Sequence, residues 1–222
     1  MKFNHVPTPE LEQPEVVYSD IGRFYVVGGM KLPSVTTVLG AYPKPELLEW
    51  RERIGEEEAK KIMNQASIRG ECVHTICEKY LNNDPDHALG QMPGNVETFR
   101  FIKKVIDENI NNIHYQEAPL YSKFLRTAGR VDCIAEWQGK LSIIDFKTSR
   151  NRKRKSWIEN YFMQTSAYAV MHEELLGKPI SQVVIIIALD EEPETQVFVE
   201  QRDNYIKGFL SVRRRFKEDY GV

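Results

Sequence analysis

The chain has 222 residues and a mass of 25.8 kDa, and with 41% hydrophobic and 28% charged residues its composition lies close to the globular average. That composition excludes intrinsic disorder, collagen and a coiled coil as descriptions of the whole chain. The formal net charge is only -2, so the chain as a whole lacks the strong positive charge of many nucleic-acid-binding proteins.

Cysteine usage and hydropathy both indicate a soluble intracellular protein. The three cysteines, Cys72, Cys77 and Cys133, are odd in number and form no C-x-x-C pair, which argues against a disulfide framework and a structural zinc site. Reduced thiols are the simplest expectation. The longest apolar stretch, residues 183–189, is far shorter than the ~20 residues of a membrane-spanning helix, and the N-terminus lacks the apolar core of a signal peptide.

The first third of the chain is predicted to hold an arm, a β-hairpin and helices. Residues 1–15 are rich in proline and glutamate and form the predicted arm. Two short apolar segments on either side of residues 19–22 predict a small hairpin. Ser34 is a candidate N-cap for a short helical segment. Helical composition over residues 46–64 and an apolar face at helical spacing over residues 68–81 predict two further helices.

Strands and helices alternate through the remainder of the chain. Residues 182–189 form an apolar, β-branched run, which is typical of a strand buried on both faces. Residues 157–176 predict a helix that Gly177 ends. The other predicted elements are strands over 115–121, 130–137, 140–147 and 195–200 and helices over 96–110 and 205–216. Because no internal repeat or linker interrupts this order, we expect one α/β domain, residues 1–222, with a mixed central sheet flanked by helices.

The most informative segment is residues 129–149, GRVDCIAEWQGKLSIIDFKTS. Gln138-Gly139 occupies the place of a two-residue hairpin turn. If the residues next to this turn form the closing pair, Asp132 faces Asp145 directly across the two strands, with Cβ atoms about 4.5–5.5 Å apart. Two like charges so close destabilise a sheet unless something offsets them, and a divalent cation can do so by binding both carboxylates. A register slip of one residue would separate the two aspartates.

Lys147 follows Asp145 by two residues and is therefore expected on the same face of the strand. Asp145-Phe146-Lys147 is the only Asp-x-Lys in the chain, and the only Glu-x-Lys, residues 58–60, falls in a predicted helix. This arrangement suits a metal site with a cationic partner. The alternative is a structural hairpin whose acids pair with nearby arginines, and the hairpin alone does not decide between the two.

Two predicted helices each carry a pair of polar residues one turn apart. His74 and Glu78 lie at i and i+4 and are able to present an imidazole and a carboxylate to one metal ion. The alternative is a partly buried histidine that pairs with the glutamate. Gln164 and Tyr168 have the same spacing and polar ends able to bind a phosphate or a base. Here the structural alternative is a half-buried tyrosine beside a solvated glutamine.

Basic residues gather directly after the Asp-x-Lys. Residues 147–155 contain six cations and no acid: Lys147, Arg150, Arg152, Lys153, Arg154 and Lys155. A second group comprises Arg213, Arg214, Arg215 and Lys217. Such runs are often only a solvated face, but the first one follows the candidate metal site, so we expect it to contact a phosphate backbone. The small net charge therefore conceals local positive patches.

Five ordered segments together resemble the PD-(D/E)xK nuclease superfamily, and within it the RecB-like exonuclease branch. They are RGECVHTICEKYL, EAPLYS, GRVDCIAEW, IIDFKTS and QTSAYAVM, and they span Arg69 to Met171. The earlier segment LPSVTTVLG is similar to phage and mitochondrial genome-maintenance exonucleases of this branch. The resemblance implies a restriction-endonuclease-like catalytic core over residues 95–222, preceded by an N-terminal arm and helical region over residues 1–82.

The resemblance implies a metal site and a catalytic lysine. Asp132, Asp145 and the backbone carbonyl of Phe146 would be metal ligands, and His74 would complete or flank their shell. Lys147 would orient the attacking water and stabilise the developing negative charge. Oxygen-rich ligands suit one or two Mg²⁺ or Mn²⁺ ions. An iron–sulfur cluster, present in some relatives, is not expected because three scattered cysteines cannot supply its four ligands.

The resemblance also implies residues next to the DNA. Gln164 and Tyr168 match the Gln-x-x-x-Tyr motif of the branch, and we count both among the catalytic residues. Glu78 and Glu117 match acidic positions whose roles vary within the superfamily, and we include them as candidate metal ligands. Arg69, at the start of the first segment, joins the basic run as a predicted DNA contact.

We therefore expect a metal-dependent deoxyribonuclease that acts on DNA ends, with single-stranded DNA or processed duplex ends as substrates, in replication, recombination or repair. The alternatives are a structure-specific endonuclease with the same site and a non-cleaving nucleic-acid-binding subunit of a larger complex. No G-x-x-x-x-G-K-[ST] segment is present, so a helicase motor is not expected. The expected partners are DNA and replication or recombination proteins, without a membrane. The expected location is the cytoplasm of a bacterium or phage-infected cell rather than the mitochondrial matrix.

Overall fold

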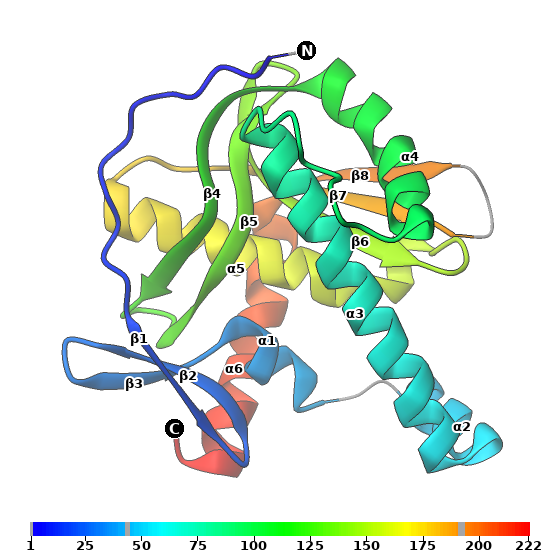
Figure 1. Cartoon of the computed structure of the whole chain (residues 1–222). Coiled ribbons are helices and arrows are strands. Elements are labelled where there is room, and N and C mark those ends of the chain that lie inside the picture. Colours follow the sequence, from blue (N-terminus) through cyan, green and yellow to red (C-terminus); the bar gives the residue numbers. More distant parts are fainter. Residues whose placement is uncertain (1, 43–44, 191–193) are drawn as a thin grey trace.

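The computed structural model describes residues 2–42, 45–190 and 194–222 (Figure 1). A five-stranded sheet forms its centre, in the order β4-β5-β6-β7-β8. The strands are β4 (Ile110–Ser122), β5 (Thr127–Trp137), β6 (Lys140–Ser149), β7 (Gln182–Leu189) and β8 (Thr195–Gln201). Strands β6 and β7 are parallel and the other neighbours are antiparallel. The predicted mixed sheet within an α/β fold is therefore confirmed.

The β5–β6 hairpin has the predicted register. Trp137 pairs with Lys140, and the ladder continues in step as far as Cys133 and Ile144. Residues 138 and 139 have φ angles of 50° and 79°, and a type I′ hairpin turn requires positive φ at both of these positions. Such a turn matches the twist of the strands that it joins, so it determines which residues oppose one another across the hairpin.

The parallel pair β6–β7 requires a crossover, which helix α5 (Glu159–Leu176) provides. Gly177 ends this helix as predicted, with a φ of 67° and a hydrogen bond from its N–H to the carbonyl of Glu173. Every residue of β7 is buried, which confirms the prediction of a strand covered on both faces. The crossover thereby carries Gln164 and Tyr168 across the sheet beside β6.

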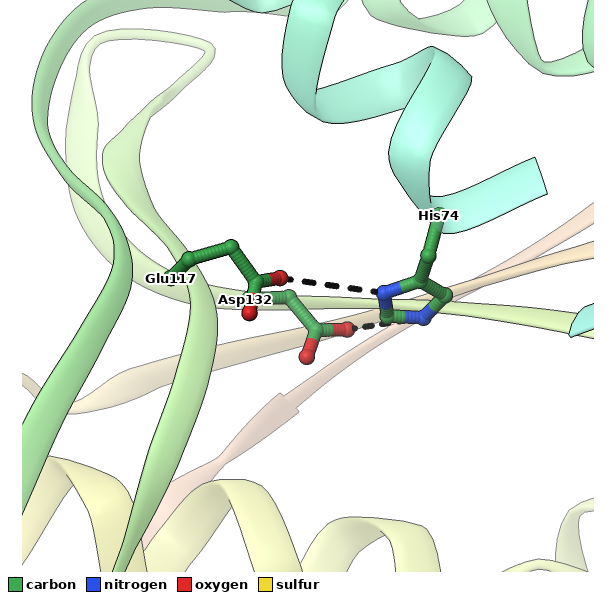
Figure 2. Close-up of side chains that lie close together, drawn as sticks. All are labelled: His74, Glu117 and Asp132. Carbon is green, nitrogen blue, oxygen red and sulfur yellow. Dashed lines mark ion pairs between the residues drawn. The ribbon is translucent and has the colours of Figure 1, made fainter. Parts of the chain in front are cut away.

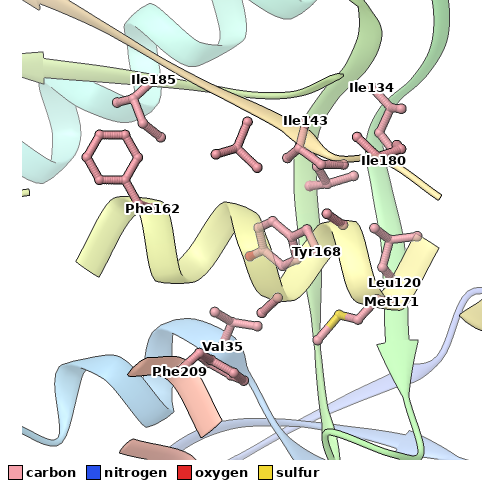
Figure 3. Packing of buried hydrophobic residues seen from close by; sticks show 14 of the residues in the cluster. Val35, Leu120, Ile134, Ile143, Phe162, Tyr168, Met171, Ile180, Ile185 and Phe209 are labelled. Atoms are coloured by element: carbon pink, nitrogen blue, oxygen red, sulfur yellow. The ribbon is translucent and has the colours of Figure 1, made fainter. Parts of the chain in front are cut away.

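Helices cover both faces of the sheet (Figure 1). They are α3 (Glu56–Leu81) and α4 (Pro93–Asn109) on one face, and α5 and α6 (Ile206–Tyr220) on the other. Phe162 and Phe209 belong to the core cluster beside α5 (Figure 3). Ile76 and Ile102 belong to the cluster beneath α3 and α4. Because alternate residues of a strand face opposite sides, consecutive residues of β6 contribute to different clusters.

The N-terminal region forms a sheet of its own. The predicted hairpin is β1 (Glu15–Ser19) and β2 (Gly22–Val27), and a third strand that the sequence analysis did not identify, β3 (Met30–Pro33), pairs with β2. Helix α1 (Val35–Gly40) follows. Its predicted cap is confirmed, because Ser34 Oγ accepts a hydrogen bond of 2.9 Å from the N–H of Thr37.

The helices before residue 82 differ from the prediction. A break was expected between residues 64 and 68, but α3 runs through this segment without interruption, and the break lies at Gly55, after α2 (Pro45–Ile54). Gly55 has a φ of 86°, which a glycine adopts without strain, whereas residues 65–67 carry no helix-breaking residue. From Glu56 to Ile68 every residue except Ala59 is exposed, so this half of α3 projects with α2 from the body of the protein (Figure 1).

The arm and the cysteines agree with expectation. Phe3 is buried, and the N–H of Val6 donates to the carbonyl of Ile113, so the arm is held against β4. All three cysteines are free thiols. Within the part of the chain that the structure describes, no helix combines the length and the apolar character that crossing a membrane demands.

Candidate active site

Three potential metal ligands from different elements converge at one point (Figure 2). His74 projects from α3, Glu117 from β4 and Asp132 from β5. The Nε2 atom of His74 lies 3.2 Å from Oδ2 of Asp132, and its Nδ1 atom lies 3.9 Å from Oε1 of Glu117. One ligand atom from each residue lies within 4.8 Å of the other two. The two carboxylates and the imidazole are therefore close enough to share one cation.

The peptide group of Phe146 completes this cluster. Its carbonyl oxygen lies 2.5 Å from Nε2 of His74, and its N–H donates a 3.0 Å hydrogen bond to Oδ2 of Asp132. The side chain of Asp132 thus bonds to the backbone of β6 just beyond the last regular pair of the ladder, Cys133 and Ile144. Asp132 and Asp145 lie on the two strands of the hairpin, each one residue beyond this pair. The backbone N–H that donates to Asp132 helps to accommodate its negative charge there.

The spacing of these atoms fits a small divalent ion. Ligands bound at right angles to an ion with bonds of ~2.1 Å lie about 3.0 Å apart. The 2.5 Å and 3.2 Å separations of His74 Nε2 from Phe146 O and Asp132 Oδ2 bracket that value. The carboxylate and carbonyl oxygens of this set are the ligands that Mg²⁺ and Mn²⁺ prefer. His74, Asp132 and Phe146 therefore form the part of the predicted ligand set that the fold brings together, with Glu117 beside them.

Asp145 lies next to this cluster but faces other partners. It is 1% exposed, and its Oδ2 atom lies 2.5 Å from Nζ of Lys147, while its Oδ1 atom accepts a 3.0 Å hydrogen bond from Nε2 of Gln164. Asp132 and Asp145 thus contact different side chains in two adjoining groups, and the sharing of one cation by both carboxylates stays a prediction. One contains His74 and Asp132, and the other contains Asp145 and Lys147.

The charges of the site perturb its pKa values. Burial lowers the pKa of His74, but the carboxylates of Asp132 and Glu117 outweigh this effect and raise it to about 9. Nε2 donates to the carbonyl oxygen of Phe146 in this arrangement, so it must release that proton in order to bind a metal ion. Burial and the carboxylate of Asp132 raise the pKa of Asp145 against the opposing effect of Lys147. Burial lowers the pKa of Lys147, yet Asp145 and Asp132 raise it overall, so the lysine remains an ammonium ion.

Gln164 and Tyr168 are both buried, so the structural alternative of a solvated glutamine and a half-buried tyrosine is wrong. Gln164 contacts the pair of Asp145 and Lys147 through its hydrogen bond to Asp145. Tyr168 is 2% exposed and lies against Gly129, where an added Cβ would meet its Cε1 atom at 2.7 Å. Burial raises the pKa of Tyr168, and the nearby carboxylates of Asp132 and Asp145 raise it further. Tyr168 therefore lies under the site, packed in the core beside β5.

Glu78 and Tyr161 lie at the edge of the site. Burial and the nearby carboxylate of Glu117 raise the pKa of Glu78, which lies beside the cluster without joining it. Tyr161 was not identified from the sequence, yet Nζ of Lys147 lies 5.3 Å from the centroid of its ring. A signal for Tyr161 existed, because it precedes Gln164 by three residues and Tyr168 by seven and so lies on the same helix face.

Several cations that were predicted to contact DNA form ion pairs with acidic side chains. Arg152 forms an ion pair with Glu194, and Lys155 forms one with Glu200 of β8. Arg69 pairs with Asp190 at 2.8 Å. These acids come from β8 and from the segment between β7 and β8, so the fold supplies counter-charges that are absent between residues 147 and 155. The second basic group contains a structural member, since buried Arg213 donates to the backbone carbonyls of Arg126 and Val222.

A groove lies between the projecting helices and the start of α5, and it adjoins Lys147 through Tyr161, whose ring centroid lies 5.3 Å from Nζ of Lys147. It consists of two cavities of about 540 and 560 Å³ that share Lys153 and Tyr161 in their linings. The first cavity also includes Tyr42, Arg51, Met63, Trp157 and Asn160, and the second includes Ile62, Arg69, Thr148, Arg150 and Asp190. The predicted DNA contacts Arg69, Arg150 and Lys153 thus line one continuous surface.

Comparison with known proteins identifies the family to which the chain belongs. Mitochondrial genome maintenance exonuclease 1 of Homo sapiens is 30% identical over 172 residues, and that of Mus musculus is 28% identical over 184 residues. The alignments cover 71% and 77% of this chain but 49% and 54% of the relatives, so the chain spans about half the length of the curated relatives it matches. The model of the PD-(D/E)XK nuclease superfamily matches residues 96–219, which is more than half of the chain. The chain belongs to the PD-(D/E)XK nuclease superfamily.

Proposed function

We propose that this protein is a metal-dependent DNA exonuclease that acts on single-stranded DNA or processed duplex ends in replication, recombination or repair. The observation that carries the proposal is the buried pair of Lys147 and Asp145 beside the group of His74, Glu117 and Asp132. A buried ion pair contributes little to stability, so a protein that only binds DNA gains little from keeping one. The names of the curated relatives support action as an exonuclease.

Divalent metal ions are the cofactors of nucleases of this superfamily. When bound, such ions polarise the phosphodiester, lower the pKa of a bound water and neutralise the leaving oxygen. We propose that Asp132, Asp145, the carbonyl of Phe146 and His74 hold one or two Mg²⁺ or Mn²⁺ ions per chain, with Glu117 and Glu78 as further candidate ligands. The atomic spacing described above and the chemistry of the donor set support this assignment.

The other residues have distinct roles in the proposed reaction. Lys147, as an ammonium ion, stabilises the negative charge that develops on the phosphoryl oxygens and orients the attacking water. Asp145 holds that ammonium group in position, and Gln164 in turn holds the carboxylate through its amide N–H. Tyr168 has an indirect role, because its buried ring packs against β5 at Gly129 and does not reach solvent.

The organisation and setting of the protein are part of the same proposal. We propose one nuclease domain over residues 1–222, with residues 1–82 as its N-terminal arm and helical region and residues 95–222 as its catalytic core. Its partners are DNA and replication or recombination proteins. Its location is the cytoplasm of a bacterium or phage-infected cell, although the curated relatives are named as mitochondrial.

The test is digestion of linear DNA labelled at the 5′ or the 3′ end, single-stranded and double-stranded, with Mg²⁺, with Mn²⁺ and with EDTA. We expect progressive shortening from an end in either metal and no reaction in EDTA. A circular single strand supplies the control for the mode of attack: an exonuclease spares it, whereas a structure-specific endonuclease attacks internal positions at a suitable structure. Binding without any cleavage under all of these conditions would indicate the non-cleaving subunit instead.

A further inference from the structure

Trp157 is a large aromatic side chain that the catalytic site does not explain. It ends the short helix η1 (Lys155–Trp157) between β6 and α5 and is 52% exposed. It lines a concave surface together with basic side chains, and tryptophan is enriched at surfaces where proteins bind partners. We propose that Trp157 stacks on a base of the DNA strand that approaches the active site. The inference rests on the proposed function, because it takes nucleic acid as the occupant of the groove.

The groove connects Trp157 to the catalytic lysine. Trp157 lines the first of the two cavities, and Thr148, which follows Lys147, lines the second. Tyr161 lines both cavities and lies beneath Nζ of Lys147 at 5.3 Å. A strand whose phosphate reaches Lys147 and continues along the groove therefore passes Tyr161 before it reaches Trp157.

The chemistry around Trp157 suits a nucleotide with its base unpaired. The guanidinium of Arg154 lies 5.2 Å from the centroid of the Trp157 ring, which brings a positive charge beside an aromatic face. Arg51 and Lys153 line the same cavity and add positive charge for phosphates. Alternation of aromatic rings with cations is how proteins bind single strands without sequence preference, because every base has a face that stacks.

A second exposed aromatic residue provides a matched contrast. Phe124 is 72% exposed, yet it lies in the β4–β5 turn, outside the groove, and lines a separate cavity with Arg126 and Arg214. Phe124 is thus an exposed aromatic ring near basic residues that lies apart from the cavities lined by Trp157 and Tyr161. The proposal accordingly applies to Trp157 and not to Phe124.

The test compares the binding of two fluorescein-labelled oligonucleotides of equal length by the full chain in EDTA. One is oligothymidylate, and the other has abasic sites throughout its central half and therefore keeps the phosphates but lacks the bases. The variants are Trp157→Ala, Trp157→Phe and the control Phe124→Ala, each checked for folding by its thermal denaturation. A base–aromatic stack corresponds to roughly 5- to 150-fold in affinity.

We expect Trp157→Ala to weaken oligothymidylate binding within that range and to change binding of the abasic strand by less than about twofold. Trp157→Phe should restore most of the affinity, and Phe124→Ala should leave it unchanged. Equal losses on both strands, wild-type affinity in Trp157→Ala, or no binding of either strand by the wild-type chain would overturn the proposal. Cleavage in Mg²⁺ is measured separately, so an inactive protein that still shows the stacking pattern would contradict the proposed function and not this inference.

Discussion

The Nζ atom of Lys147 lies 2.5 Å from the Oδ2 atom of Asp145, and both side chains are largely removed from solvent at the end of β6. Their i, i+2 spacing on a strand places them on one face, and that face is covered by α5. The hydrogen bond from Gln164 to the other oxygen of Asp145 leaves the carboxylate with two partners, one charged and one neutral. The pair is therefore the proposed catalytic centre, and removal of either partner would leave the other charge buried without its counter-charge.

Lys147→Ala is expected to abolish DNA cleavage and to lower the free energy of unfolding. The substitution leaves the Asp145 carboxylate buried without its counter-charge, and breaking a buried pair in this way costs about 3–5 kcal/mol. Cleavage of end-labelled DNA in Mg²⁺ and urea denaturation measure the two effects.

The double substitution Asp145→Asn, Lys147→Met is the control for the ion pair. It removes both charges at similar volume, so stability should return to within about 1 kcal/mol of the wild-type protein while cleavage stays absent. Full cleavage by the single or the double variant contradicts the catalytic assignment. A double variant as unstable as Lys147→Ala would show that the unpaired carboxylate of Asp145 does not cause the loss of stability.

Divalent ions are expected to raise the thermal denaturation temperature of the wild-type chain. A ligand that binds only the folded state stabilises it by mass action, and the cluster of His74, Glu117 and Asp132 is the proposed binding site. In Asp132→Asn the stabilisation by Mn²⁺ should be lost or strongly reduced.

Glu71→Gln provides the matched control for that experiment, because Glu71 is an exposed acid on the same helix as His74, outside the cluster. It should keep the wild-type response to Mn²⁺. An equal response in Asp132→Asn and in Glu71→Gln would remove the support for a metal site at Asp132.

Gly129→Ala is expected to destabilise the protein by about 1–3 kcal/mol through overpacking. The new methyl group would lie 2.7 Å from Cε1 of Tyr168, a ring that is buried in the core and cannot swing into solvent. Gly94→Ala is the comparison, since an added Cβ meets no atom within 4 Å there and alanine favours the helix. Thermal denaturation of the two variants should therefore shift in opposite directions, and a neutral Gly129→Ala would show that Tyr168 is not tightly held.

The pH dependence of stability should contain a contribution from His172. Burial lowers the pKa of this histidine, although a 2.9 Å hydrogen bond from its Nδ1–H to the carbonyl of Lys178 opposes the shift. Below the unfolded-state pKa of about 6.5 the unfolded chain takes up the proton more readily than the folded chain does. The stability associated with neutral His172 is thus complete above this pH and is lost as the pH falls below it.

The measurement for this prediction is the urea midpoint between pH 7 and pH 5. In His172→Gln the decline over this interval should be shallower than in the wild-type chain, because one proton-binding difference between the folded and unfolded states has been removed. Parallel declines in the two proteins would show that His172 does not contribute.

The local features of the fold follow from nearest neighbours and could be predicted. The register of the β5–β6 hairpin depends on a two-residue turn with positive φ at both positions, and Gly139 is well suited to one of them. Ser34 caps α1 through a residue three positions away, and the apolar run of β7 can only be accommodated in the interior. Composition alone did not distinguish Gly55 from the polar residues before Ile68, so the helix break was expected at the wrong place. The φ of residue 55 is one that only glycine adopts without strain.

The sequence by itself determined the residue types of the site, their order and the register that brings Asp132 close to Asp145. Only the tertiary structure decided their partners: Asp132 with His74 and the Phe146 peptide, Asp145 with Lys147 and Gln164. The same holds for the basic run, whose counter-charges Glu194 and Glu200 lie about forty residues further along the chain. The physical reason is that hydrogen bonds and ion pairs depend on distances of a few ångströms between atoms that different elements supply. Packing of α3 and α5 against the two faces of one sheet, rather than any local pattern, sets those distances.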